Sequence, residues 1–354
     1  MVVQNPNPLI TTIIPTFRRP KLLRRAINSV LRQTYPHFQI CVFDNASGDE
    51  TGPVVAEFAK TDSRVKYHCR RENIGPGLNF AYAMESVETP YFSVLSDDDV
   101  LLPSFYQTAL AGFERWPEAV CSVTATVQVY SQGHVHSVPI SRWKPGLYRP
   151  PEGMLAMVKY SHPEWTSVLF RKEAIQMAGG LDPETGGPSD LDFELRLAAR
   201  YPIVVSKQPG ALFVVHPEGC SSTPDLSLFW PGGAKMIRNL VQDEHIPAEA
   251  RAYAERVLSA RLKSVLTAYG LGSLARRNLD DAFKVAEVLG NHYGLRTRAR
   301  LLRAAASACR LFPPARYPVA AVRKLRSSLR DATLAPRRRQ LQQRYGAYVR
   351  YLDF

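Results

Sequence analysis

The chain has 354 residues, which is more than one compact domain usually holds, so two structural units are expected. Apolar residues make up 45% of the chain and charged residues 22%, values that exclude both wholesale disorder and a fibrous architecture. The net charge is +13, and the whole excess lies in residues 291–354, which contain 15 basic and 2 acidic residues.

The five cysteines are far apart in the sequence and form no CxxC pair: Cys41, Cys69, Cys121, Cys220 and Cys309. Their odd number and wide spacing argue against a disulfide framework and a zinc knuckle, and favour a reducing, cytosolic compartment. The first residues, MVVQNPNPLITTIIP, lack a basic region, so no signal peptide is expected. Because no run of about 18 apolar residues occurs, no membrane-spanning helix is expected either.

Between Leu9 and Val215, short runs of β-branched and aromatic residues alternate with amphipathic segments, which is typical of an α/β sheet covered by helices. Strands are expected at 10–15, 38–44, 64–69, 91–96 and 119–130, and helices from 20, at 52–60, at 78–87 and from 103. A hairpin through Gly133 follows, and then a less regular stretch at 139–165 that is rich in Pro, Trp and Tyr. Long loops of this kind usually cover the site of an α/β enzyme.

The character of the chain changes after Pro217. Ser, Pro and Gly dominate residues 217–233 and predict a linker, after which Ala, Leu and Arg dominate. Helices are expected at 234–242, 247–270, 278–289, 296–311, 317–330 and 336–351. We therefore expect an α/β domain at residues 1–220 and an α-helical domain at 221–354, which ends in the basic tail 291–354.

Three consecutive carboxylates, Asp97, Asp98 and Asp99, follow the apolar strand at 91–96. They repel one another and need a compensating cation, which a divalent metal would supply. Oxygen ligands of this kind suit Mg²⁺ or Mn²⁺, which bind through one or two carboxylates together with substrate phosphates. The alternative is that the triplet only caps the helix expected from Pro103, because Asp is favoured at helix N-termini.

The position of the triplet favours the metal site. Polar clusters also follow the first two strands, Thr16 to Arg18 after the first and Asp44 with Asn45 after the second. In open α/β sheets, ligands bind beyond the carboxyl ends of the strands. Three such clusters at three strand ends therefore predict one binding site.

Six segments now stand in a characteristic order: IIPTFRRP, VFDNASGDE, ENIGPGLNFAYA, VLSDDDVLLP, GGLDPETGGPSDLDFELRLA and VVHPEGCSS. Together they resemble glycosyltransferase family 2, whose members have the GT-A fold, and the resemblance covers about residues 9–220. It implies a Rossmann-like mixed sheet flanked by helices, with the α-helical region following it. It also implies an inverting, metal-dependent transfer of sugar from a nucleotide-sugar donor.

The resemblance implies positions for the nucleoside. Pro15, Thr16 and Phe17 would line its pocket, and Asp44 would accept a hydrogen bond from the base. A carboxylate suits the N3–H of uracil, which favours a uridine or thymidine diphosphate donor.

The same resemblance places the diphosphate and the metal. Asn73 and Gly75 would let the backbone approach the nucleotide, Asp97 would face the ribose or the sugar, and Asp98 would bind Mn²⁺ or Mg²⁺. The chain departs from the family pattern DxDD because Ser96 replaces its first acid. Which of the three aspartates contact the metal therefore stays open.

The later acidic segment would supply the catalytic base. Asp190 matches the family position that takes the proton of the acceptor hydroxyl, although Ser189 replaces the acid that usually precedes it. Asp192 and Glu194 are better interpreted as favourable charges near a helix N-terminus. His216 ends the last strand, where it is either a metal ligand or a structural histidine. Trp143 and Trp165 would stack on an acceptor sugar or belong to the core, and we favour the core.

The segment AVRKLRSSLRDATLAPRRRQLQQRYGAYVRYL mixes arginines with Leu, Val and Tyr, which suits an anionic membrane surface. A solvated helical face is the alternative. A glycan or lipid-linked acceptor at the cytoplasmic face of the cell membrane, in bacterial cell-surface polysaccharide biosynthesis, would fit such a tail.

Two other functions compete with this interpretation. A sugar-phosphate nucleotidyltransferase shares the sheet and the metal site but normally has a glycine-rich first loop, and PTFRRP at 15–20 contains no glycine. A non-catalytic membrane- or nucleic-acid-binding protein is the second. Residues 1–290 are neutral overall and contain no nucleic-acid motif, so no nucleic-acid partner is expected.

Overall fold

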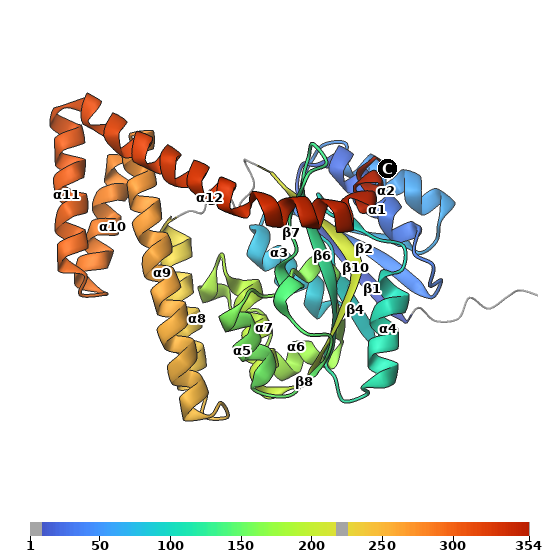
Figure 1. Ribbon diagram of the computed structural model, residues 1–354. Coiled ribbons are helices and arrows are strands. Elements are labelled where there is room, and N and C mark those ends of the chain that lie inside the picture. Colours follow the sequence, from blue (N-terminus) through green and yellow to red (C-terminus); the bar gives the residue numbers. More distant parts are fainter. Residues whose placement is uncertain (1–8, 217–225, 354) are drawn as a thin grey trace, which may run out of the picture.

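The computed structural model describes residues 9–216 and 226–353, and its centre is one mixed sheet of ten strands (Figure 1). The strands are β1 (Ile10–Thr16), β2 (Phe38–Asp44), β3 (Val65–Cys69), β4 (Tyr91–Val94), β5 (Val100–Leu101), β6 (Cys121–Tyr130), β7 (Val135–Ser137), β8 (Gly146–Tyr148), β9 (Val168–Arg171) and β10 (Ile203–Val215). Their order in the sheet is β3-β2-β1-β4-β9-β6-β10-β5, with β7 paired to β6 and β8 to β10.

Helices cover the sheet and then continue beyond it. They are α1 (Pro20–Leu31), α2 (Thr51–Thr61), α3 (Pro76–Glu85), α4 (Phe105–Arg115), α5 (Glu152–Lys159), α6 (Glu173–Ala178), α7 (Ser189–Arg200), α8 (Leu226–Gln242), α9 (Ala248–Arg276), α10 (Leu279–Asn291), α11 (Arg296–Leu311) and α12 (Arg316–Tyr345). The described residues also form short 3-10 helices: η1 (Pro139–Arg142), η2 (Trp165–Ser167), η3 (Pro183–Thr185), η4 (Pro313–Ala315) and η5 (Gly346–Leu352). The expected α/β order is confirmed.

The direction of the strands brings four strand ends to one edge. β1 runs parallel to β2 and β4, and β10 runs parallel to β6. β9 is antiparallel to both β4 and β6, so β10 points the same way as β4. The carboxyl ends of β1, β2, β4 and β10 therefore lie at the same edge of the sheet.

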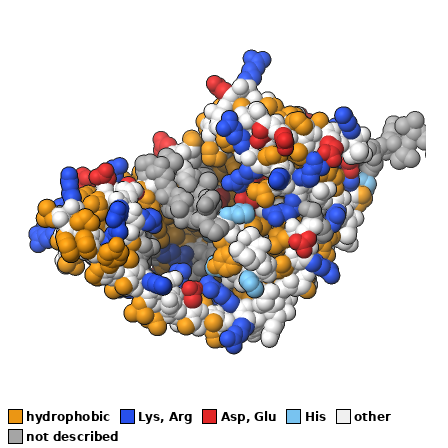
Figure 2. Space-filling model, turned by 90° about the horizontal axis from the view of Figure 1, so that it is seen from above, with side chains coloured by type: hydrophobic (Ala, Val, Ile, Leu, Met, Phe, Trp, Pro, Cys, Tyr) orange, Lys and Arg blue, Asp and Glu red, His pale blue; other side chains and the backbone are white. Residues whose placement is uncertain are grey.

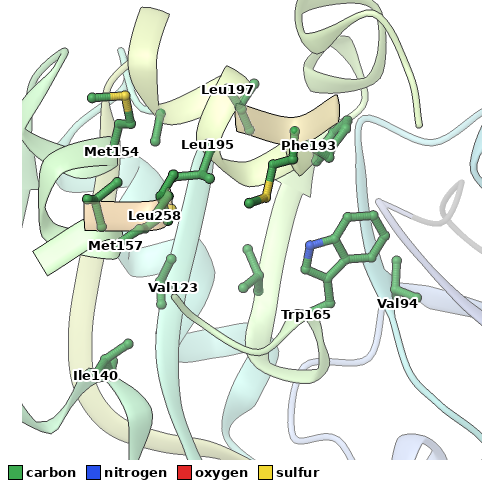
Figure 3. Close-up of a cluster of buried hydrophobic side chains, with 14 of the residues drawn as sticks. Val94, Val123, Ile140, Met154, Met157, Trp165, Phe193, Leu195, Leu197 and Leu258 are labelled. Carbon is green, nitrogen blue, oxygen red and sulfur yellow. The ribbon is translucent and has the colours of Figure 1, made fainter. Parts of the chain in front are cut away.

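Each face of the sheet has its own apolar layer because the strands are buried on both sides. α1, α2 and α4 cover one face around Ile14, Ile27 and Phe105. The other face packs against α3, α5, α6 and α7. Figure 3 shows this second layer, in which Val94 and Val123 of the sheet lie with side chains of α5 and α7.

The second core continues into the C-terminal helices. Leu258 of α9 lies beside Met157 of α5 in Figure 3, and the same cluster runs on through α10 and α11. Both Trp143 and Trp165 are buried in it, 3% and 8% exposed, which confirms the core interpretation of these two residues. The division of the chain at residue 220 stays a prediction.

The linker prediction for 217–233 is wrong in its second half, because α8 begins at Leu226 and includes Pro231, Gly232 and Gly233. The glycines are packing residues: a Cβ on Gly232 would lie 1.8 Å from the carbonyl oxygen of Thr185 in η3. Residues 217–225 lie outside the described residues, and with them Cys220, the expected boundary and the end of the segment VVHPEGCSS.

The expected break between helices 317–330 and 336–351 is also wrong, since α12 is one helix with Pro336 inside it. Residues 324–333 are exposed, so water can hydrate the carbonyl that Pro336 leaves without a backbone donor. The end of α12 packs on the β7 hairpin, where the Val135 N–H donates to Gln342 Oε1 at 2.7 Å. α12 thus runs from α11 back to the sheet (Figure 1).

Among the described residues, no helix combines the length and the apolar character that crossing a membrane requires. The four described cysteines are free thiols.

Candidate active site

The first part of the site joins the ends of β1 and β4. Thr16 Oγ1 donates to Asp97 Oδ2 at 2.7 Å, and Arg19 Nη1 lies 3.2 Å from Asp97 Oδ1 and 2.9 Å from Asp98 Oδ2. Burial raises the pKa of Asp97 to about 6, although the Thr16 hydroxyl and Arg19 oppose the shift. Arg19 therefore neutralises part of the acidic triplet in the protein alone.

Asp98 and His216 come together from β4 and β10, with Asp98 Oδ2 3.7 Å from His216 Nε2. The Asp98 main chain is fixed by Arg25, whose Nη2 donates to the Asp98 carbonyl. Asp98 is less buried than Asp97, with 18% of its side chain exposed against 7%. It is the carboxylate that a solvent-borne cation would reach first.

These residues fit a divalent metal that is shared with phosphates. In the described parts of the chain, 9–216 and 226–353, no group of three or more Asp, Glu, His or Cys residues is arranged to hold a metal alone. A carboxylate and an imidazole 3.7 Å apart leave the remaining positions to substrate oxygens and water, as nucleotide-dependent sites usually do. The imidazole nitrogen favours Mn²⁺ over Mg²⁺, which prefers oxygen ligands alone.

The third aspartate is structural. Asp99 is fully buried, accepts a hydrogen bond from Thr166 Oγ1 at 2.6 Å and a second from the Val214 N–H at 2.9 Å. Burial, and then the charge of Asp98, raise the pKa of Asp99 well above its ordinary value. None of the triplet caps α4, whose N-cap residue is Ser104, so the capping alternative is wrong.

The second part of the site joins the end of β2 to the loop before α3. Asn45 Nδ2 donates to Asn73 Oδ1 at 2.9 Å, and the Ile74 N–H donates to Asn45 Oδ1. Gly75 has φ of 83° and open space where a Cβ would stand, so a ligand can approach this backbone.

Asp44 is nearly enclosed beside that loop. It is 1% exposed, and its carboxylate accepts from the Ser47 N–H and hydroxyl and from the Tyr67 hydroxyl at 2.6 Å. Phe17 remains 37% exposed at the end of β1, next to the buried Pro15. A base would thus meet the Phe17 ring and the rim of the Asp44 pocket.

Asp190 lies in the first turn of α7, where its Oδ1 accepts the Leu191 N–H. It lies within electrostatic range of Glu164, His162 and Glu194, because its charge contributes to the pKa shifts of all three. Glu164 in turn contributes to the shift of Asp99. Glu164 thus lies within electrostatic range of both Asp190 and Asp99.

The group around Asp190 contains one cation among carboxylates. His162 Nδ1 lies 3.3 Å from Glu194 Oε2, and Glu194 is 4% exposed. Burial lowers the pKa of His162, but Glu194, Asp190 and Glu164 together outweigh burial and raise it to about 10. Burial also raises the pKa of Glu194, so both groups keep their protons to higher pH than free side chains do.

Asp192 lies in the first turn of α7, as expected for a favourable charge near a helix N-terminus, and both Asp192 and Glu194 are also buried. Asp192 is fully buried and binds Arg196 Nε at 2.7 Å and Asn239 Nδ2 at 2.9 Å, which ties α7 to α8. Glu194 belongs to the group around Asp190.

Sequence reasoning missed Arg19, His162 and Glu164. The signal for Arg19 was the need of the acidic triplet for a cation, combined with two arginines in PTFRRP. His162 and Glu164 lie in the irregular stretch SHPEW, which has no periodicity that assigns a face to either side chain.

Residues 11–177 match the family described as Glycosyl transferase family 2. A GalNAc(5)-diNAcBac-PP-undecaprenol beta-1,3-glucosyltransferase of Campylobacter jejuni is 34% identical over 104 residues, which are 29% of this chain and 34% of that protein. An uncharacterized glycosyltransferase of Rickettsia typhi is 33% identical over 98 residues, 28% of this chain and 30% of that protein.

The crystal structure of S. aureus TarS 1-349 is similar with a TM-score of 0.62 over 85% of this chain and 90% of that one, at 14% identity. At this identity the likeness shows the fold, which is the GT-A fold of glycosyltransferases. The chain spans about a third of the length of the two curated relatives. Residues 11–177 therefore form a glycosyltransferase family 2 domain.

Proposed function

We propose that this protein transfers a sugar from a nucleoside diphosphate sugar to an acceptor hydroxyl, with inversion at the anomeric carbon. The observation that carries the proposal is the pairing of Asp98 with His216 at 3.7 Å, beside Asp97 and Thr16, at the edge where four strands of a family 2 domain end. An acidic, partly exposed strand-end site is where such a fold binds a metal-bridged diphosphate.

The donor is of the uridine or thymidine type. Asp44 is the acceptor for the base N–H, Pro15, Thr16 and Phe17 line the nucleoside, and the open backbone at Asn73 and Gly75 borders it. Tyr67 shares the Asp44 carboxylate and sets the depth to which a base can enter. The S. aureus TarS 1-349 structure in complex with UDP-GlcNAc, with a TM-score of 0.61, supports a uridine donor.

Asp98 and His216 are the protein ligands for Mn²⁺ or Mg²⁺, and Asp97 is oriented by Thr16 toward the ribose or the sugar. When bound, the metal neutralises charge that develops on the departing diphosphate. Arg19 contacts Asp97 and Asp98 and would be available to bind a phosphate oxygen if a metal were held by Asp98.

Asp190 is the catalytic base. The acceptor oxygen forms a bond to the anomeric carbon as the bond from that carbon to the diphosphate breaks, and the hydroxyl proton passes to Asp190. Glu164, His162 and Glu194 surround Asp190, so the acceptor hydroxyl enters a polar end of an otherwise apolar layer.

The acceptor is a glycan or a lipid-linked glycan of the bacterial cell surface. The printed name of the Campylobacter jejuni relative includes an undecaprenol-linked substrate, which supports a lipid-linked acceptor. The excess of basic residues at 291–354 supports a peripheral position on the cytoplasmic face of the cell membrane.

A panel of nucleotide sugars with Mn²⁺ tests the proposal through the nucleoside diphosphate released. We expect Asp98→Asn to abolish release and Asp190→Asn to lower it by about a hundredfold or more, while Asp331→Asn, an exposed aspartate on α12, leaves it unchanged. Pyrophosphate formed from a nucleoside triphosphate and a sugar phosphate would instead identify a nucleotidyltransferase. Equal activity of the Asp98 variant and the unaltered protein would contradict the proposal.

A further inference from the structure

The corner where α11 turns through η4 into α12 presents apolar side chains to solvent. Leu311 is 87% exposed, Phe312 63% and Tyr317 60%. Figure 2 shows hydrophobic side chains gathered on this helical end of the molecule, with Lys and Arg side chains around them. Large apolar groups that cluster on a surface usually mark an interaction site.

A cavity of about 260 Å³ opens at the same corner. Three arginines line it, Arg277, Arg310 and Arg316, and its other walls are Leu274, Leu279, Cys309 and Pro313. None of these arginines has a carboxylate of another described residue within 4.0 Å. The cavity is smaller than the ~300–1,000 Å³ of sites that enclose a drug-sized molecule, so it suits a small anionic group.

Guanidinium groups bind phosphate oxygens in pairs, and three around one apolar cavity are well placed to hold a phosphate. The neighbouring Leu311 and Phe312 side chains suit the boundary between headgroups and acyl chains. We propose that the α11–α12 corner docks on an anionic lipid bilayer, with a lipid headgroup phosphate in the Arg277–Arg310–Arg316 cavity. The α11–α12 corner would thus be the surface through which the protein contacts the membrane in the proposed function. The docking depends on that function only because the function explains why a membrane contact would be useful.

Charge argues against a second copy of the chain as the partner that binds the α11–α12 corner. Residues 291–354 contain 15 basic and 2 acidic residues, so a symmetric contact through this corner would bring like charges together. The exposed Leu311 argues against nucleic acid, because a phosphate backbone offers nothing for an aliphatic group to pack on.

Vesicle co-sedimentation tests the proposal with the full chain and vesicles of phosphatidylcholine containing phosphatidylglycerol. We expect the triple variant Arg277→Gln, Arg310→Gln, Arg316→Gln to bind about a hundredfold more weakly, at about fivefold for each basic residue. The double variant Leu311→Ser, Phe312→Ser should lose about tenfold or more. Both sets of side chains are largely at the surface, so thermal unfolding should show that these variants fold.

Matched controls lie elsewhere on the chain. Lys60→Gln, Lys66→Gln, Lys172→Gln removes three exposed charges from the sheet domain, and Val265→Ser removes an exposed apolar side chain from α9. We expect both to bind vesicles as the unaltered protein does. The proposal would be overturned if the lysine control lost as much vesicle binding as the arginine triple variant. It would also be overturned if the unaltered protein bound vesicles of pure phosphatidylcholine as tightly as vesicles that contain phosphatidylglycerol.

Further measurements distinguish a lipid from other ligands of the α11–α12 corner. Inorganic phosphate that binds the cavity without any vesicle binding would identify a free-anion site and overturn the docking. Sedimentation velocity that shows a dimer lost in the Leu311, Phe312 variant would identify a second copy, and retention on an oligonucleotide lost in the arginine variant would identify nucleic acid. Diphosphate release from the free nucleotide sugar should be unchanged in all these variants, so a failure of docking is distinguishable from a failure of the proposed function.

Discussion

The three aspartates of the acidic triplet have different environments although they are consecutive. Asp99 is buried and fully hydrogen-bonded, Asp97 is held by Thr16 and shares Arg19, and Asp98 is the most accessible. Burial disfavours the charged form at the first two, so their pKa values rise. This difference is what makes Asp98 the proposed metal ligand.

Arg19 competes with a metal for Asp98. We expect Arg19→Gln to tighten Mn²⁺ binding, because the 2.9 Å contact to Asp98 is lost and one positive charge leaves the site. An ion pair this exposed is worth about 0.2–1 kcal/mol, so the affinity for Mn²⁺ should increase by up to about fivefold. Titration of Mn²⁺ followed by its electron paramagnetic resonance signal measures it, with Arg24→Gln, which pairs with Glu57, as the control. Weaker Mn²⁺ binding by the Arg19 variant would contradict this expectation.

Loss of the base should act on turnover and leave the donor bound. We expect Asp190→Asn to lower kcat by about 10²–10⁴-fold with little change in the Kd of the nucleotide sugar. Stopped assays of transfer, combined with calorimetry of donor binding, separate the two quantities. A variant that loses donor affinity in proportion to turnover would place Asp190 at the donor instead.

Removal of His162 leaves Glu194 buried without its cation. At neutral pH we expect His162→Gln to lower the free energy of unfolding by about 3–5 kcal/mol. Its carboxylate neighbours raise the folded pKa of His162 to about 10, above its unfolded value, so the stability contributed by His162 is fully present below about pH 6.5, and the deficit shrinks as pH rises toward 10. Unfolding curves at several pH values measure this trend. The double variant His162→Gln, Glu194→Gln should recover most of the loss, and a deficit independent of pH would refute the pairing.

The sequence predicts helices and strands most accurately where the local residue pattern agrees with the packing in the fold. The strand at Phe38–Asp44 and the helix at Arg296–Leu311 lie where their periodicity places them. The first part of α8 was missed because Pro231, Gly232 and Gly233 read as a linker, whereas contact with η3 requires a glycine there. Likewise the strand-end carboxylates are visible in the sequence, but the His162–Glu194 pair joins an irregular loop to a helix and depends on tertiary packing.

The contact of α8 with η3 gives a test at this scale. We expect Gly232→Ala to destabilise the fold by about 1–3 kcal/mol, because its Cβ would overlap the Thr185 carbonyl oxygen. Gly77→Ala in α3 is the matched control: its Cβ has open space, and alanine favours a helix. Chemical denaturation measures both. If Gly232→Ala left the free energy of unfolding unchanged, α8 would not approach η3 so closely.

For the whole molecule, the charge is divided between a neutral part, residues 1–290, and a basic part, residues 291–354. Attraction between exposed charges is screened within about 10 Å at 0.1 M salt. We therefore expect added salt to weaken vesicle binding steeply while the KM for the nucleotide sugar changes little. Vesicle co-sedimentation and turnover, each measured over the same series of salt concentrations, check this expectation. If vesicle binding and the KM responded equally to salt, the basic part would not act separately from the catalytic site.

The proposed convergence of Asp98, His216 and Asp190 on one donor is tested most directly by a crystal structure of the protein with Mn²⁺ and a non-hydrolysable nucleotide sugar, using the anomalous signal of manganese. We expect a manganese peak bonded to the Asp98 carboxylate and the diphosphate, with Asp190 facing the anomeric carbon on the side opposite the diphosphate. A donor bound elsewhere, or an Asp190 carboxylate turned away from its sugar, would contradict the proposed function.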